Sequence, residues 1–245
     1  MGNFPRLAVV AVILALGMVL SSALLSKLFV RIRREQAITV KGYAEKDLVS
    51  DVGRFTCAYS ARGSSLREAY DRLQEARMVV LEYVRARGFG DGDIATGTIE
   101  TSKVAKRDVH GGEMNEVEYY DVAQAITVTS SNVTMVRDVA NSITELIKEG
   151  IDVSACSREF YVSDLKDTKL ELLAKATEDG YRRAVALAAN SRGKVGALIS
   201  AQQGVFQITR RNSTDTSGYG EYNTSAIEKT AKAVVTLEYA IEAER

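Results

Sequence analysis

The first pattern along the chain is an apolar run without a charged residue, Leu7–Ser26. A helix of this length at about 1.5 Å rise per residue measures roughly 30 Å, the thickness of the hydrocarbon core of a bilayer. The run predicts a transmembrane helix within a signal-anchor segment, residues 1–35. A cleavable signal peptide is the alternative, because Ser21-Ser22-Ala23 offers small residues for cleavage. Apolar residues continue to Val30, which favours an uncleaved anchor.

The charges around this run conflict with an exported body. Only Arg6 precedes the run, whereas four cations follow it: Lys27, Arg31, Arg33 and Arg34. The positive-inside rule, applied to this count, places the remainder of the chain in the cytoplasm.

Residues 36–245 alternate between two periodicities. Segments in which apolar and polar residues alternate with period two predict β-strands. These segments are Ala37–Ala44, Val52–Arg62, Ile94–Val104, Val117–Ser130, Val153–Val162, Val195–Ala201, Gly204–Thr209 and Ala231–Ile241. The segments 94–104 and 117–130 are expected to form a hairpin joined by the polar connection Ala105–Glu116.

Helical periodicity and capping residues predict three helices. Ser65 and Glu68 form a capping-box pattern before a helix that ends at Gly88. Asn132 caps a second helix, which ends near Gly150. The order strand, capped helix, glycine, strand therefore occurs twice, which indicates a weakly duplicated β-α-β unit and an α+β fold with an antiparallel sheet packed by helices.

The third and longest helix is expected from Asp164 to about Ser191. Its expected apolar stripe is Leu170, Leu173, Thr177, Tyr181, Ala184, Val185 and Ala188. Gly180 lies within this helix at a cost of about 1 kcal/mol relative to alanine. It therefore indicates a close contact, either on the sheet or between subunits.

Composition excludes several functions. Lys+Arg and Asp+Glu are 32 each, so no net charge attracts nucleic acid. His110, the single histidine, is expected in an exposed turn, and one histidine makes both a histidine metal site and a Ser-His-Asp triad implausible. Asp91-Gly92-Asp93 lacks the further ligands of a calcium loop and is expected to be a turn. The chain has no Gly-Lys-Ser/Thr phosphate loop. No catalytic, cofactor-binding or metal-binding residue is predicted.

Two cysteines, Cys57 and Cys156, lie far apart in the sequence. Two thiols in an exported protein can pair, but two small buried hydrophobic residues are the plainer interpretation. The sequence leaves both alternatives open.

An ordered set of segments resembles the SIMPL domain family and covers nearly all of residues 37–242. The segments are ITVKGYAEKDLVSD, SLREAYDRLQEARMVVLEYVRARGFGDGDIATGTIET, YYDVAQAITV, VSACSREFYVSDLKDTKLELLAKATEDGYRRAVALAANSRGKVGALISAQQ and AKAVVTLEYAI. This resemblance implies an α+β fold and export to the cell envelope. Similar proteins include a periplasmic immunogenic antigen that assembles into ring- or channel-like oligomers, and relatives are linked to envelope and oxidative stress. The chain departs from many members at Ser50-Asp51, where they have Pro-Asp, and in its long apolar leader.

Anchor and resemblance together predict a membrane-anchored SIMPL-domain envelope protein. It is expected to be non-catalytic, to form a homo-oligomer, to be held in the cytoplasmic membrane by residues 7–26, and to place its body, residues 36–245, on the outer side. A link to envelope or oxidative stress is implied by the resemblance alone. The alternative is a small-ligand-binding module that uses residues 210–230 with Tyr219 and Tyr222. No cofactor and no nucleic acid is expected, and the identity of a small-molecule ligand stays open.

Overall fold

The computed structural model describes residues 17–18, 21–22, 37–214 and 217–243. The predicted transmembrane helix, Leu7–Ser26, thus lies almost entirely outside the described residues. Within these residues, no helix has both the length and the hydropathy needed to cross a membrane. The body predicted as residues 36–245 divides into two compact units. Unit 1 contains residues 37–44, 170–205 and 233–243, and unit 2 contains residues 45–169 and 206–232.

Unit 2 is built on a four-stranded antiparallel sheet with the strand order β3-β4-β2-β5. Its elements are β2 (Val52–Gly63), α2 (Leu66–Ala86), η1 (Asp91–Asp93), β3 (Ile94–Arg107), β4 (Glu113–Ser130), α3 (Val133–Ser142), η2 (Ile143–Glu149) and β5 (Asp152–Tyr161). Because β2 and β3 are both antiparallel to β4, they run parallel to each other with β4 between them. The two β-α-β units expected from the sequence are therefore interlocked in one sheet, which is the split β-α-β topology of ferredoxin-like domains.

Helix starts in unit 2 agree with the capping residues in the sequence. The Ser65 hydroxyl accepts a hydrogen bond from the Glu68 backbone N–H at 3.2 Å, and the Asn132 side chain accepts one from Met135 N–H at 3.0 Å. The second half of the predicted capping box differs, because the Glu68 carboxylate accepts from the N–H and hydroxyl of Ser64 rather than from Ser65. At the start of α2, the Ser65 side chain therefore bonds to a backbone N–H of the first turn, whereas the Glu68 side chain bonds to Ser64, one residue before the cap.

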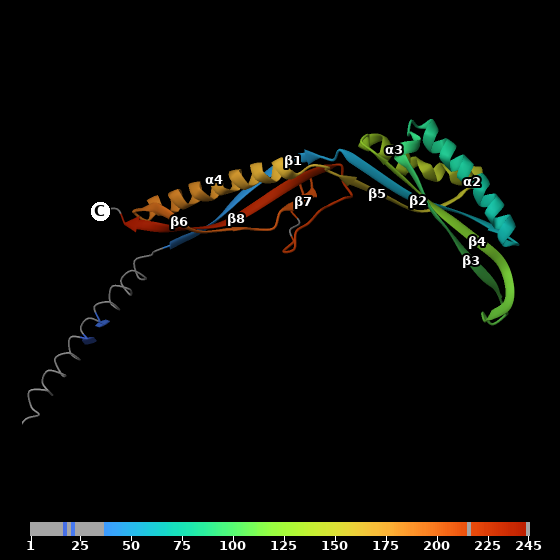
Figure 1. Cartoon of the computed structure of the whole chain (residues 1–245), viewed down its shortest axis with the longest axis horizontal. Coiled ribbons are helices and arrows are strands. Elements are labelled where there is room, and N and C mark those ends of the chain that lie inside the picture. The colour runs from blue at the N-terminus through green and yellow to red at the C-terminus, as the bar shows by residue number, and fades with distance from the viewer. Residues whose placement is uncertain (1–16, 19–20, 23–36, 215–216, 244–245) are drawn as a thin grey trace, which may run out of the picture. The chain divides into compact units, whose positions relative to one another are not determined.

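Helices α2 and α3 cover the same face of this sheet (Figure 1). The core between them and the strands contains large side chains that are almost fully buried: Phe55, Tyr59, Leu73, Val80, Ile126, Ile143, Leu146 and Phe160. The Tyr59 hydroxyl donates to Gln124 Oε1 at 2.6 Å, and Gln124 Nε2 donates to the Gly97 carbonyl at 2.7 Å. These bonds satisfy the Tyr59 hydroxyl and the Gln124 amide, both of which are buried.

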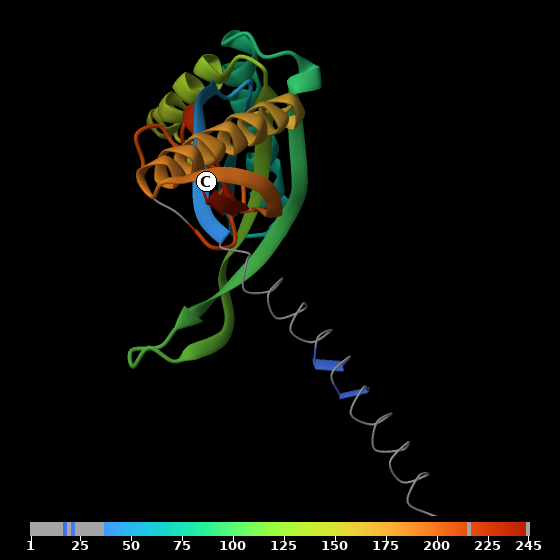
Figure 2. The ribbon, with the colours of Figure 1, turned by 90° about the vertical axis from the view of Figure 1, so that its left-hand side faces the viewer.

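The β3–β4 hairpin is longer than predicted. Most of the expected connection Ala105–Glu116 is strand, and only residues 108–112 turn. The ion pair between Lys106 and Glu116 at 2.5 Å ties the two arms together, and the hairpin extends past both helices of unit 2 (Figure 2). The exposed side chain of His110 lies in this turn, as expected.

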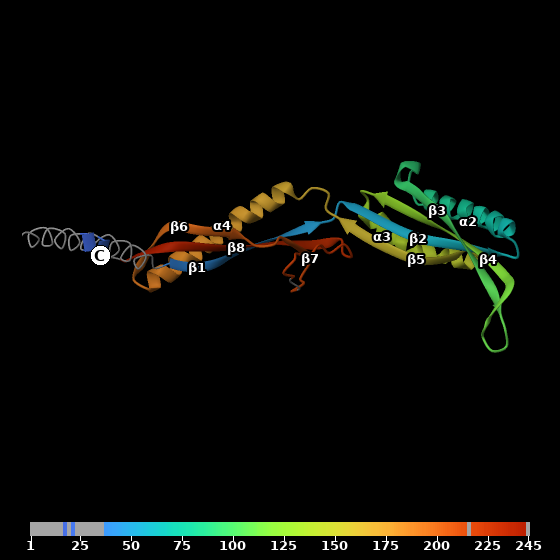
Figure 3. The same cartoon turned by 60° about the horizontal axis from the view of Figure 1, so that its bottom comes forward.

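Within residues 37–44, 170–205 and 233–243, unit 1 packs one helix on one sheet. It contains α4 from Leu170 onward, β6 (Gly193–Gln203), the first part of β1 (Ala37–Val49) and the last part of β8 (Glu228–Ala243), whereas α4 as a whole is Lys166–Asn190. The strand order is β1-β8-β6, and α4 lies along one face (Figures 1 and 3). The first residues of β8 pair with β7 (Gln207–Arg210) in unit 2.

The buried stripe of α4 corrects the sequence prediction. The buried residues are Leu172, Ala176, Gly180, Ala184 and Ala188, whereas Leu170, Tyr181 and Val185 are exposed. A Cβ on Gly180 would lie 3.3 Å from Gly42 Cα, and one on Gly42 would lie 1.9 Å from the Ala176 carbonyl oxygen. The helix therefore meets the sheet through its smallest residues, because only these allow backbone to approach backbone. Of the two roles left open for Gly180, the structure shows packing on the sheet.

Candidate functional site

The motifs first considered for chemistry have local structural roles. Asp91 lies in η1 and pairs with Arg85 at 2.8 Å, and the Asp93 carboxylate accepts from Gly90 N–H at 3.0 Å. The predicted turn is confirmed. In the described part of the chain, no three His, Cys, Asp or Glu residues are grouped so that they could hold a metal ion.

Residues 217–227, part of the loop singled out from the sequence, are held to other segments of unit 2 near their C-terminal end. Ile208 N–H donates to the Glu221 carbonyl at 2.7 Å, and the Ile208 carbonyl accepts from Asn223 N–H at 2.8 Å. Phe160 N–H of β5 donates to the Thr224 carbonyl at 2.7 Å. These backbone bonds join residues 221–224 to β7 and to the edge of β5.

A buried lysine organises the end of this loop. Lys229 follows the loop in β8, its side chain is fully buried, and its ammonium donates to the Asn223 carbonyl. The Asn223 side chain accepts from the N–H groups of Ser225 and Ala226 at 3.2 and 3.3 Å, which closes a turn. No carboxylate lies within ion-pair distance of Lys229 among the described residues, and burial lowers its pKa to about 8.

Sequence reasoning missed Lys229. The predicted strand Ala231–Ile241 begins two residues after it, whereas β8 begins at Glu228. The signal was present, because Lys229 is in phase with the buried side chains of Ala231, Ala233 and Val235. A lysine in the apolar phase of a strand indicates a buried amine with a backbone partner.

The two tyrosines predicted to contact a ligand have different surroundings. Tyr219 is fully exposed. The ring of Tyr222 packs near that of Tyr161, with 6.3 Å between centroids, and its hydroxyl accepts from Val162 N–H at 3.1 Å. Tyr222 thus anchors the loop to the residues that follow β5. In this arrangement neither tyrosine lines a described cavity.

The last residues of the loop do border a cavity. Ser225 and Ile227 line a groove of about 480 Å³ in unit 2, opposite side chains from α3 and β5. Arg137 of α3 and Arg158 of β5 contribute its positive charge. The loop therefore contributes backbone and small side chains to a cavity rather than its aromatic rings.

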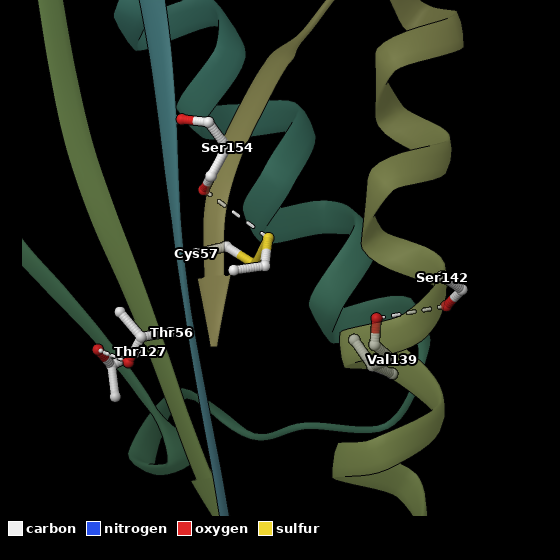
Figure 4. The surroundings of a disulfide bond; sticks show 7 residues. Thr56, Cys57, Thr127, Val139, Ser142 and Ser154 are labelled. Atoms are coloured by element: carbon white, nitrogen blue, oxygen red, sulfur yellow. Dashed lines mark hydrogen bonds between the residues drawn. A yellow bond between two sulfur atoms is a disulfide. The ribbon is translucent and has the colours of Figure 1, made fainter. Parts of the chain in front are cut away.

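The structure pairs Cys57 of β2 with Cys156 of β5, which answers the question that the sequence left open (Figure 4). Cys57 is buried in the core, whereas Cys156 lies at the surface. The strands shift register here, so that two residues of β5 stand opposite Cys57. This bulge comprises residues 155 and 156 and places Cys156 beside its partner.

The bond closes a loop of 99 residues that contains α2, β3, β4 and α3. Figure 4 shows the two sulfur atoms between the strands and the helical side of the sheet. The Cys156 sulfur lies 3.8 Å from the Ser154 carbonyl oxygen. Disulfides persist mainly in oxidising compartments, so this pair bears on where the body of the protein resides.

Comparison with protein families identifies one match. The sequence profile of SIMPL, described as a protein of unknown function (DUF541), matches residues 38–241. The match extends over both units, from β1 to β8, and leaves out only the first residue of β1 and the last two of β8 among these elements. A search of curated proteins gave no significant match.

Proposed function

Since the chain belongs to the SIMPL family, whose function is unknown, we propose that it is a membrane-anchored envelope protein without catalytic activity that self-associates through the outer edge of β6. The apolar run Leu7–Ser26 supports the anchor. The disulfide Cys57–Cys156 supports a body outside the cytoplasm, where disulfides are maintained. The four cations that follow the apolar run favour the opposite orientation. In this proposal, the family resemblance and the disulfide are the stronger evidence for the orientation.

The observation that carries self-association is the difference between the two edges of the unit 1 sheet. At the β1 edge, Tyr43 N–H donates to the Asp179 carboxylate at 2.9 Å, which occupies an amide that another strand would need. The β6 edge pairs only with β8 on its inner side in the described structure. Unpaired edge strands are templates for strand addition unless charges or covering segments block them.

The β6 edge has the composition of an interface. No charged residue occurs from Val195 to Gln203, and the side chains of Leu198 and Ile199 are 49% and 46% exposed. Register shifts occur on both sides of Leu198, which leaves Ser200–Gln203 as the regular segment. Exposed Tyr181 and Val185 lie one turn apart on α4 of the same unit. A second copy of β6 fits this edge, because an uncharged strand does not repel itself.

Pairing of two β6 edges is antiparallel and two-fold symmetric. Such an isologous contact closes on itself and joins copies in pairs, so a ring or channel would require a second interface. The proposal therefore expects even numbers of subunits. It concerns assembly and location, and assigns no substrate.

The test is to measure the mass of full-length protein in detergent over a range of concentrations by light scattering and mass photometry. We expect even-numbered oligomers for the wild type and monomers, or loss of the pairing step, for Leu198→Lys. The matched control is Val109→Lys, because Val109 is also exposed but lies in the β3–β4 turn. A wild type that is monomeric at all concentrations, or a Leu198→Lys variant that assembles normally, contradicts the proposal.

A further inference from the structure

The groove beside residues 225–228 combines an apolar surface with two arginines. It occupies about 480 Å³ of unit 2. Val49, Phe160 and Ile227 contribute apolar atoms, and Arg137 and Arg158 face it from α3 and β5. Small-molecule sites are concave, largely apolar, and equipped with a few polar groups that orient the ligand. This groove is more polar than that, because three of its nine lining residues are apolar and six are polar or charged, so it offers a small apolar patch beside several polar groups.

Arg158 has spare hydrogen-bonding capacity. Its guanidinium donates to Asn141 Oδ1, a neutral acceptor, and no carboxylate of the described residues lies within 4.0 Å of it. A guanidinium carries five N–H donors in a planar fork. Arg158 therefore brings to the groove a charge that the described part of the protein does not neutralise.

The other charges of the groove are already paired. Arg137 Nε contacts the Asp138 carboxylate at 2.9 Å. This contact uses one of the three guanidinium nitrogens of Arg137. Glu228, the acidic residue of the lining, is 3.4 Å from Arg211 Nη1. Arg211 also contacts the Asp47 carboxylate at 3.3 Å, so Glu228 shares its cation. Among the described residues, Arg158 is the cation of the groove lining that has no carboxylate within 4.0 Å.

We propose that this groove binds a small organic acid, whose carboxylate contacts the guanidinium groups of Arg158 and Arg137 and whose apolar body packs against Phe160 and Ile227. Planar guanidinium groups bind carboxylates in a bidentate manner, and charge-assisted bonds of this kind are stronger than neutral ones. The apolar lining favours an acid with a hydrocarbon or aromatic body over a fully hydrated inorganic anion. The site is independent of the β6 edge and does not rest on self-association.

The first experiment uses the full-length protein in detergent, with benzoate as the probe. Benzamide has nearly the same shape without the charge, and inorganic phosphate has charge without an apolar body. We expect saturable binding of benzoate by calorimetry, and at least 10-fold weaker binding of the other two. In NMR spectra of the wild type, benzoate should shift the backbone amides of Arg137, Asn141, Arg158 and Ser225.

The second experiment uses substitutions. Arg158→Gln should weaken benzoate binding at least about 10-fold, because the charge-assisted hydrogen bonds to the carboxylate are lost. Arg85→Gln is the matched control and should bind as the wild type does, since Arg85 pairs with Asp91 and does not line the groove. Far-UV circular dichroism checks that each variant is folded, and the NMR shifts of the wild type require no variant.

Three results would overturn the proposal. The first is absence of saturable benzoate binding, or of shifts at the groove, in the wild type. The second is unchanged affinity in a folded Arg158→Gln variant. The third is phosphate or benzamide binding as tight as that of benzoate, because the site would then not recognise a carboxylate on an apolar body.

Discussion

Gly42 and Lys229 show how single residues set the packing of each unit. Gly42 in β1 lies so near α4 that a Cβ would be 1.9 Å from the Ala176 carbonyl oxygen and 2.7 Å from Gly180 N. Both are backbone atoms, so a side-chain rotation cannot relieve the overlap. The helix as a whole would have to move away from the sheet.

Gly42→Ala should therefore destabilise unit 1 by at least about 2 kcal/mol, as expected for overpacking that shifts a backbone. Gly92→Ala is the control, because nothing lies within 4 Å of its Cβ position, and its effect should stay within about 0.5 kcal/mol. Denaturant unfolding followed by circular dichroism measures both. Equal stability of the two variants would show that α4 does not pack this closely on β1.

Lys229 makes the stability of unit 2 depend on pH. Burial lowers its folded-state pKa to about 8 from 10.5, so between these values the unfolded chain binds more protons than the folded one. The contribution of Lys229 to the free energy of unfolding is therefore constant below pH 8. It should rise by up to about 3 kcal/mol between pH 8 and pH 10.5. The measurement is the free energy of unfolding from pH 7 to 10.5. Lys229→Met should lack this rise and Lys232→Met should keep it; identical pH profiles for all three proteins would contradict the assignment.

At the scale of elements, the disulfide links two neighbouring strands of the unit 2 sheet. It joins β2 to β5 around a loop of 99 residues. Closing a loop of about 100 residues is worth up to about 4.7 kcal/mol in the chain-entropy model, and removal of native disulfides typically costs about 2–5 kcal/mol. Cys57→Ala with Cys156→Ala should therefore lower the urea midpoint of unit 2.

Reductant provides the control for this prediction. Dithiothreitol should destabilise the wild type by a similar amount and leave the double variant unchanged. The wild type should also migrate faster than the double variant on a non-reducing gel, since a closed loop makes the denatured chain more compact. Insensitivity of the wild type to reductant would mean that the bond contributes nothing to stability.

At the scale of the whole molecule, the leader and the disulfide make a joint prediction about location. A reporter enzyme that folds only outside the cytoplasm should be active when fused after Arg245, and Cys57 and Cys156 should resist thiol alkylation in intact cells until reductant is added. Deletion of residues 1–35 should abolish reporter activity and leave both thiols free. Activity of a reporter that works only in the cytoplasm would reverse the proposed orientation, in favour of the charge count around the apolar run.

The local predictions succeeded where the controlling interactions are themselves local. Ser65 and Asn132 cap the helices that they were expected to cap, since a cap involves residues only three positions apart. The bounds of β2 and the order of the two β-α-β units followed from periodicity in the same way. The buried stripe of α4 was predicted wrongly. Hydrophobic periodicity gives most weight to bulky apolar residues, whereas the residues that pack on the sheet are mostly small.

The groove could not be predicted from sequence. Arg137, Arg158 and Ile227 come from three separate elements, and nothing in the spacing of these residues indicates that they share a cavity. The tyrosines of the loop attracted attention because aromatic side chains often line binding sites. In the structure one tyrosine is exposed and the other contacts Tyr161. Composition therefore identified a segment that borders a groove, but not the side chains that line it.

By itself the amino-acid sequence determined the apolar leader, the positions of the helices and most strands, the family, and the repeated order of elements. These depend on periodicity and on contacts between neighbours in the chain. Tertiary structure alone decided that Cys57 meets Cys156, that Lys229 is buried against a backbone carbonyl, that β6 lies at the edge of its sheet among the described residues, and that two arginines share a groove. Each of these depends on which distant segments become adjacent, and that is set by the packing of whole sheets and helices.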